Sequence, residues 1–278
     1  MRAFALVTLF VAGCAGEMLP PREIVPLGGP SHGFIHARGV RIPERGPGFV
    51  RARPGEETAY GVPALVALLE RAAATVAREF PGTPPIHVGD LSRPFGGRHE
   101  RHHSHRSGRD ADVIYYATDE VGRPVVGGGF LAYDRYGDAR DAREGEAPAP
   151  LTFLDEARTW AFFRVLLAED DTPVEWIFCS TGVKSRLLAY AVAHETSPAV
   201  LLRAAYVLHQ PLDGRPHDDH FHVRMSCTRD ERALGCRDGG PVWPWQRRDA
   251  FGDEAMPTLD DAALWHAVAD DAPAGDVE

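Results

Sequence analysis

Apolar residues recur at intervals of three and four positions between Gly61 and Phe80, and this spacing predicts an amphipathic helix. The dipeptide Pro81-Gly82 ends it. The apolar positions are Val62, Leu65, Val66, Leu68, Leu69, Ala72, Ala73 and Val76. Further helices are expected over residues 153–168, 183–194 and 198–208.

Short apolar runs predict strands at 86–88, 111–116, 174–179 and 221–225. A Gly-, Pro- and His-rich loop follows the first of them, and residues 117–150 form a charged insertion with little packing signal. Short strands separated by helices, without Gly-rich turns between them, favour an α+β fold. We expect a small antiparallel sheet flanked by helices in a single catalytic domain.

The first fourteen residues differ from the rest of the chain. Arg2 precedes a run that is almost wholly apolar and ends at Ala12, which suits a signal peptide and is shorter than the roughly 20 residues of a membrane span. The run closes on Val-Ala-Gly-Cys14, which resembles a bacterial lipoprotein cleavage box. This pattern predicts that Cys14 is lipidated, and a plain secretory peptide with a chance cysteine is the alternative. Because Ala15 and not Asp follows, we expect periplasmic anchoring to the outer membrane.

These patterns divide the chain into four parts. Residues 1–13 are the predicted signal peptide, 14–50 a lipid-anchored tether and lead-in, and 51–245 the catalytic domain. Residues 246–278 form an acidic tail. The formal net charge of −10 argues against a broad nucleic-acid-binding surface.

Three cysteines remain after Cys14. Cys227 and Cys236 are close in sequence and can form a disulfide in an oxidising compartment. Cys179 lies in an apolar run, which favours a buried thiol over a nucleophile.

Two clusters rich in His and Asp stand about 100 residues apart, at 101–112 and 217–222. Each borders a predicted strand, so both can converge on one metal ion. His220 and His222 are two apart and share one face of a strand, and Gly108 permits the turn that brings His105 to Asp112.

Two imidazoles and one carboxylate leave a fourth position open for water, as in a catalytic zinc site. Ser104, Asp218 and Asp219 are nearby candidates to support the ligands. Either cluster alone can be a solvated loop or an adventitious metal binder. Two clusters, each followed by a strand, favour the zinc site.

The pattern Ser104-His105-x-x-Gly108-x-x-x-Asp112, followed by His220-x-His222, resembles the LAS metallopeptidases. It is most similar to the penicillin-insensitive murein endopeptidase family. The similarity includes Tyr60-Gly61-x-Pro63, Gly89-Asp90-Leu91-Ser92, Gly96-Gly97, Trp176-Ile177-Phe178 and His222-Val223-Arg224. It extends over roughly residues 25–240.

The resemblance implies an LAS-like fold and a zinc peptidase that cleaves peptidoglycan cross-links between a D-amino acid and diaminopimelate. It assigns zinc to His105, Asp112 and His222, with His102 where the family has another metal-site histidine. His220 would act as general base or transition-state stabiliser, assisted by His217. Cys227 and Cys236 fall where the family has a short disulfide loop.

Some positions depart from the family pattern. Arg106 stands where Gln is usual, and Phe34 where some relatives have a cysteine. No histidine occurs between His105 and His194, so the additional metal pair of some relatives is not expected. Two alternatives stay open, a zinc-binding but non-catalytic module of the cell envelope and a D-Ala-D-Ala-type carboxypeptidase.

Overall fold

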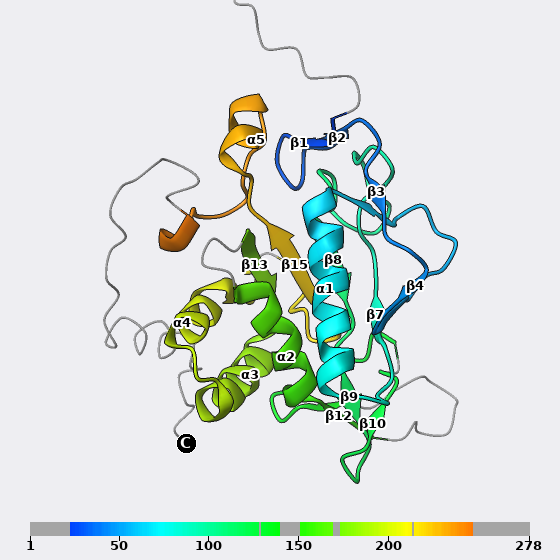
Figure 1. Ribbon diagram of the computed structural model, residues 1–278, viewed down its shortest axis with the longest axis vertical. Helices are drawn as coiled ribbons and strands as arrows, with labels where there is room; N and C mark the ends of the chain where they lie inside the picture. Colours follow the sequence, from blue (N-terminus) through cyan, green and yellow to red (C-terminus); the bar gives the residue numbers. More distant parts are fainter. Residues whose placement is uncertain (1–22, 128, 140–150, 169–172, 213, 247–278) are drawn as a thin grey trace, which may run out of the picture.

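The computed structural model describes residues 23–127, 129–139, 151–168, 173–212 and 214–246 (Figure 1). The predicted signal peptide, Cys14 and, apart from Gln246, the predicted acidic tail 246–278 therefore lie outside the described residues. Within them, the chain is a mixed α+β fold, as the sequence predicts. No helix of this described part is long and apolar enough to cross a membrane.

The central sheet is larger than expected. Seven strands are ordered β14-β13-β15-β8-β7-β5-β4, and the pairs β13–β14 and β5–β7 are parallel. The sequence predicts a small antiparallel sheet, whereas the observed sheet is larger and mixed. The strands are β4 (Arg45–Gly46), β5 (Phe49–Arg51), β7 (Ile86–Val88), β8 (Asp110–Val113), β13 (Val174–Phe178), β14 (Leu208–His209) and β15 (Phe221–Met225).

Four helices pack together beside this sheet (Figure 1). They are α1 (Pro63–Glu79), α2 (Glu156–Leu167), α3 (Thr181–His194) and α4 (Pro198–Val207), close to their predicted ranges. In α1, seven of the eight apolar positions named above are buried within the helix, and Val62 is its buried N-cap. The side chains of Asp155, Ser180 and Ser197 cap α2, α3 and α4 by accepting a backbone N–H.

Two segments without a strong sequence pattern join the fold. From residue 23, the predicted lead-in forms β1 (Val25–Leu27), β2 (Phe34–His36), β3 (Val40–Arg41) and the central strands β4 and β5. Part of the insertion forms a second sheet, ordered β10-β9-β12-β11. Its strands are β9 (Ala117–Thr118), β10 (Pro124–Val125), β11 (Asp138–Ala139) and β12 (Thr152–Leu154). The lead-in and the insertion therefore contribute to the packed structure.

The C-terminal described segment carries the disulfide. Cys227 and Cys236 are bonded, as predicted, on either side of α5 (Arg229–Leu234). The 3-10 helix η1 (Pro244–Gln246) ends the described chain. Elsewhere in the fold, the short strand β6 (Tyr60–Gly61) pairs with β3. Cys179 is buried, also as predicted.

Alternation along β8 and β15 separates the core from the polar cluster. Phe221 is fully buried and its ring packs edge-on against Phe162 and Phe163 of α2, at 5.5 and 4.8 Å between centroids. Successive strand residues point to opposite faces, so Phe221 places its neighbour His222 on the face away from α2. The same alternation puts Asp110 and Asp112 of β8 on that face.

Candidate metal centre

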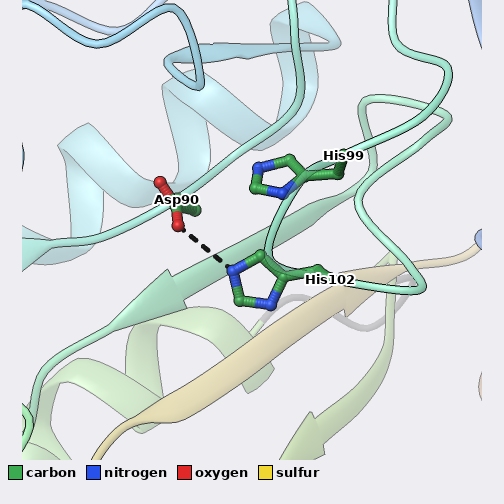
Figure 2. A group of neighbouring side chains, drawn as sticks. All are labelled: Asp90, His99 and His102. Carbon is green, nitrogen blue, oxygen red and sulfur yellow. Dashed lines mark hydrogen bonds and ion pairs between the residues drawn. The ribbon is translucent and has the colours of Figure 1, made fainter.

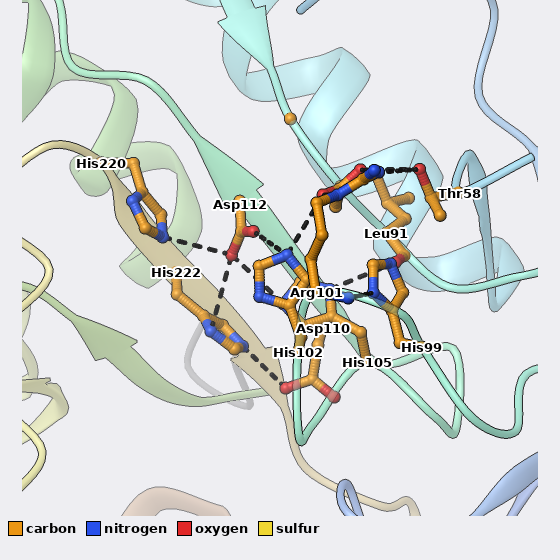
Figure 3. Close-up of polar contacts among 12 residues, drawn as sticks. Thr58, Leu91, His99, Arg101, His102, His105, Asp110, Asp112, His220 and His222 are labelled. Atoms are coloured by element: carbon orange, nitrogen blue, oxygen red, sulfur yellow. Dashed lines mark hydrogen bonds and ion pairs between the residues drawn. The ribbon is translucent and has the colours of Figure 1, made fainter. Parts of the chain in front are cut away.

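Strand pairing brings the two His/Asp clusters together. In the antiparallel pair β8–β15, Asp112 lies opposite His222 and Asp110 lies opposite Arg224. All four side chains belong to the polar face of the sheet; Figure 3 shows Asp110, Asp112 and His222 converging there, and Arg224 contacts Asp110. The two clusters, about 100 residues apart in sequence, therefore come together as the sequence predicts. His105, His220 and His222 each have a ring nitrogen within 3.6 Å of an Asp112 oxygen.

A strained turn delivers His105. Its φ is +62°, which is uncommon for a residue with a side chain, and Gly108 follows at +77°. A Cβ at Gly108 would be strained by this positive φ and would lie 2.7 Å from Ile35 Cδ1, so glycine is favoured there. The His105 Nδ1–H donates to the Leu91 carbonyl at 3.2 Å, because that oxygen can only accept. This bond leaves the Nε2 lone pair facing Asp112, at 3.2 Å from Oδ1.

His222 is oriented by a second aspartate. Its Nε2–H donates to Asp110 Oδ1 at 2.8 Å, and Arg224 Nε donates to the same oxygen at 2.6 Å. A carboxylate held by an arginine is ionised and accepts only, so the proton of the neutral His222 ring is on Nε2. The Nδ1 lone pair then faces Asp112 Oδ1, at 3.6 Å.

Four imidazole nitrogens surround the Asp112 carboxylate. Their distances to its oxygens are 3.2 Å for His105 Nε2, 3.3 Å for His102 Nε2, 3.5 Å for His220 Nε2 and 3.6 Å for His222 Nδ1. Both Asp112 oxygens and His105 Nε2 are buried and lack a hydrogen-bond partner among the described residues. Buried polar atoms without partners are rare, and here they are of the types that bind a metal ion. The donor set therefore fits a cation at Asp112.

A neighbouring group, Asp90, His99 and His102, also has metal-ligating side chains (Figure 2). Its carboxylate is already engaged: Arg101 donates to both Asp90 oxygens at 2.8 Å, and Arg53 donates at 3.3 Å. His102 Nε2 lies 3.1 Å from Asp90 Oδ2. Two guanidinium groups repel a cation, so this cluster is a poorer metal site than that at Asp112. His102 would have to leave Asp90 to bind a metal through Nε2.

His220 has an orienting carboxylate of its own. Its Nδ1–H donates to Asp219 Oδ1 at 2.5 Å, which turns the Nε2 lone pair of the neutral ring toward Asp112. His217 lies next to it, with ring centroids 5.1 Å apart, and has a positive φ of +57°. The His217 Nδ1–H donates to the Arg215 carbonyl at 2.8 Å. Both predicted catalytic histidines therefore lie beside the proposed ligands.

The two histidines at the start of β15 differ in their preferred charge. Burial lowers the pKa of His222 to about 3, so this ring stays neutral, as a ligand must. Burial acts in the same direction on His220, but Asp112 and Asp219 outweigh it and raise its pKa to about 10. Burial likewise acts to lower the pKa of His105, but the negative charge of Asp112 outweighs burial, and the pKa of His105 is raised. A cation bound to Asp112 would offset that negative charge and favour neutral rings.

A groove passes over this centre, and His220 and His222 are in its wall. Although the whole chain is acidic, the charged residues of the groove other than histidine are mostly cationic. They are Arg53, Arg101, Arg215, Arg224, Asp219 and Asp238. Aromatic rings of Phe130, Trp176 and Phe178 also line it. The lining of the groove therefore suits a ligand that carries negative charge.

Sequence reasoning missed several supporting groups. The missed groups are Asp110 on His222, the Leu91 carbonyl on His105 and Asp90 on His102. Asp219, which was predicted as support, does contact His220. Asp218 uses its backbone carbonyl to accept the Tyr133 N–H. The one available signal was the i, i+2 spacing of Asp110 and Asp112, which places both on one strand face.

Substituting Asp110 by asparagine should weaken zinc binding by roughly 10–100-fold, the usual cost of losing a group that supports a metal ligand. An amide keeps the size of the side chain but has no negative charge to hold the Nε2–H of His222. Zinc affinity measured by competition with a chelator tests this expectation. An unchanged affinity in a folded Asp110→Asn variant would show that Asp110 serves only to pair with Arg224.

Comparison with known proteins adds two similarities. A family model described as "Penicillin-insensitive murein endopeptidase" matches residues 26–126, which include His102, His105 and Asp112. A curated penicillin-insensitive murein endopeptidase from Haemophilus influenzae is 28% identical over 233 residues, covering 82% of this chain and 71% of the relative. Both findings confirm the resemblance seen in the sequence motifs.

Proposed function

We propose that this chain, which is related to the penicillin-insensitive murein endopeptidases, is a zinc-dependent peptidase that hydrolyses peptide cross-links of peptidoglycan. The bond cleaved joins a D-amino acid to diaminopimelate. The carboxylate of Asp112 is the observation that carries this proposal, because it is buried, lacks hydrogen-bond partners among the described residues and faces four imidazole nitrogens.

His105, Asp112 and His222 are the proposed zinc ligands, and His102 is a further candidate. Zinc, when bound, polarises a peptide carbonyl and lowers the pKa of water. Leu91 and Asp110 fix which ring nitrogen of His105 and of His222 faces the centre. Asp112 and His222 lie opposite each other on the adjacent strands β8 and β15, which supports the proposal of an LAS-like arrangement.

His220 is the proposed general base or oxyanion stabiliser. Asp219 holds its Nδ1–H, so Nε2 is the atom that exchanges a proton with the substrate or donates to a developing oxyanion. His217 is placed to assist through its proximity to His220. A module that only binds zinc has no need of His220 held in this way, and this favours the enzyme over the non-catalytic alternative.

Mass spectrometry of cross-linked muropeptides incubated with the purified chain tests the function. An endopeptidase converts dimers to monomers without shortening the monomers' stem peptides. A carboxypeptidase would instead release single D-alanine residues. We expect conversion of dimers that stops with chelator and returns with zinc; dimers left intact by the zinc-loaded chain would contradict the proposal.

The proposed location is the periplasm, which is where peptidoglycan is accessible. We propose that residues 1–13 are removed and that lipid on Cys14 anchors the chain to the outer membrane. The domain 51–245 then holds the site, although the structure includes strands from residue 25 onward in the same fold.

The anchor gives a separate prediction. Substituting Cys14 by serine removes the thiol that receives lipid, so the chain should move from the membrane fraction to the soluble periplasmic fraction. Membrane fractionation followed by immunodetection checks this. A Cys14→Ser chain that remains in the membrane pellet would exclude lipid on Cys14 as the anchor.

A further inference from the structure

Arg53 lies in the wall of the groove, two residues beyond the end of β5. Its guanidinium stacks on the ring of Phe130 at 4.8 Å, and its Nη1 donates to Asp90 at 3.3 Å. Phe130 also packs edge-on against the His220 ring, at 5.4 Å between centroids. Arg53 is therefore held one ring away from the proposed catalytic histidine.

The Phe130 ring is close to the metal centre. A Cβ added to Gly89 would lie 3.5 Å from Phe130 Cζ and 3.1 Å from Asp112 Cβ. The backbone at Gly89 thus brings together the aromatic support of Arg53 and the proposed zinc ligand. Because Phe130 connects Arg53 to the centre in this way, we expect Arg53 to contact a substrate group near the scissile bond.

Arg53 differs from Arg101, the other guanidinium on Asp90. Arg101 uses Nε and Nη2 on both Asp90 oxygens and contacts Glu56 and Thr58 as well. In the described part of the chain, Arg53 donates to Asp90 alone, through one nitrogen. About a third of its side chain is exposed, and it faces the groove. Its remaining N–H groups are available to a ligand.

We propose that Arg53 binds the carboxylate on the substrate carbon that bears the nitrogen of the scissile amide. This assignment rests on the proposed function. A cross-link to diaminopimelate, a diamino dicarboxylic acid, leaves a free carboxylate on the carbon that bears that nitrogen, and the planar guanidinium fork matches a carboxylate with two parallel hydrogen bonds. Stacking on Phe130 restricts the guanidinium and so lowers the entropy lost on binding.

The test uses two synthetic cross-linked peptides that differ only at this group, one with the free carboxylate and one with its primary amide. For the full chain, kcat/KM should be roughly 10–100-fold lower on the amide, the usual effect of a hydrogen bond to a charged group. Arg53→Met should lower kcat/KM by a similar factor on the carboxylate peptide and by less than about twofold on the amide. Arg53→Lys, which keeps the charge but lacks the fork, should recover part of the preference.

Arg93→Met is the matched control, because Arg93 is similarly exposed but pairs with Glu57 and Glu100 outside the groove. It should leave both rates unchanged. If Arg53→Met lowers both rates by the same factor, Arg53 acts through Asp90 and the proposal is overturned.

A binding measurement separates this proposal from the proposed function. The two peptides are titrated by calorimetry into zinc-free wild-type and Arg53→Met chains, where no turnover occurs. Tighter binding of the carboxylate peptide to the wild type alone supports the role of Arg53 even if the zinc-loaded chain cleaves neither peptide. Equal binding of both peptides to the wild type overturns it even if cleavage is observed.

Discussion

Substituting Asp112 by alanine is expected to remove zinc and abolish peptidase activity. Asp112 is the shared centre of the cluster, with four imidazole nitrogens between 3.2 and 3.6 Å from its oxygens. It supplies the negative charge that a dication needs, and three protein ligands are the usual number for a catalytic zinc. Elemental analysis of the purified variant gives the zinc content directly, and muropeptide digestion gives the activity.

Asp90→Asn is the control that separates the two clusters. Burial alone would raise the pKa of Asp90, but hydrogen bonds from His102, Arg101 and Thr58 hold it well below its usual range. Asp90 is therefore a partner of cations within the protein, and we expect Asp90→Asn to retain zinc. Stoichiometric zinc in a folded Asp112→Ala chain, with zinc lost from Asp90→Asn, would move the metal to the Asp90 cluster.

The same reasoning applies to the two imidazole ligands. His105→Ala and His222→Ala should each reduce the zinc content and abolish activity, because either loss leaves two ligands from the proposed set. His105 is fully buried and His222 nearly so, so thermal unfolding of each variant should be followed alongside zinc content. Full zinc retention in both would contradict the ligand assignment.

Elements with local periodicity could be predicted from the sequence. The spacing of apolar residues identified α1, and short apolar runs identified β7 and β15 with their observed bounds. Strands β4 and β5 were missed because they have only two and three residues: β4 is held by its antiparallel pairing with β5, and β5 by its parallel pairing with β7, more distant in sequence. Such pairing depends on tertiary contacts that a single-sequence pattern does not contain.

The site was predictable in its metal-ligating residue types but not in their support. His105, Asp112 and the His220–His222 pair could be named because imidazole and carboxylate groups at these spacings suit a metal. The diagonal bond from His222 to Asp110 depends on the register of β15 against β8, which the sequence leaves undefined. Phe130 reaches the centre only through the folding of the insertion over Gly89.

Substitution of His220 by alanine should separate metal binding from catalysis. Its Nε2 faces Asp112 from 3.5 Å, while Asp219 holds the opposite ring nitrogen. If His220 is not a ligand, His220→Ala keeps zinc and the fold but loses proton transfer or oxyanion support, each worth roughly 10²–10⁴-fold in rate. The loss should appear in kcat more than in KM, because the interaction strengthens in the transition state.

His217→Ala is the comparison that tests this role for His220. The His217 Nδ1–H is used by the Arg215 carbonyl, and burial lowers the His217 pKa to about 4, so its ring is a weaker proton acceptor than that of His220. We therefore expect a smaller loss of kcat, with zinc unchanged in both variants. Steady-state kinetics on a cross-linked peptide, together with elemental analysis, decides between them. A near-normal kcat for His220→Ala with a large loss for His217→Ala would transfer the catalytic role to His217, whereas loss of zinc from His220→Ala would make His220 a ligand.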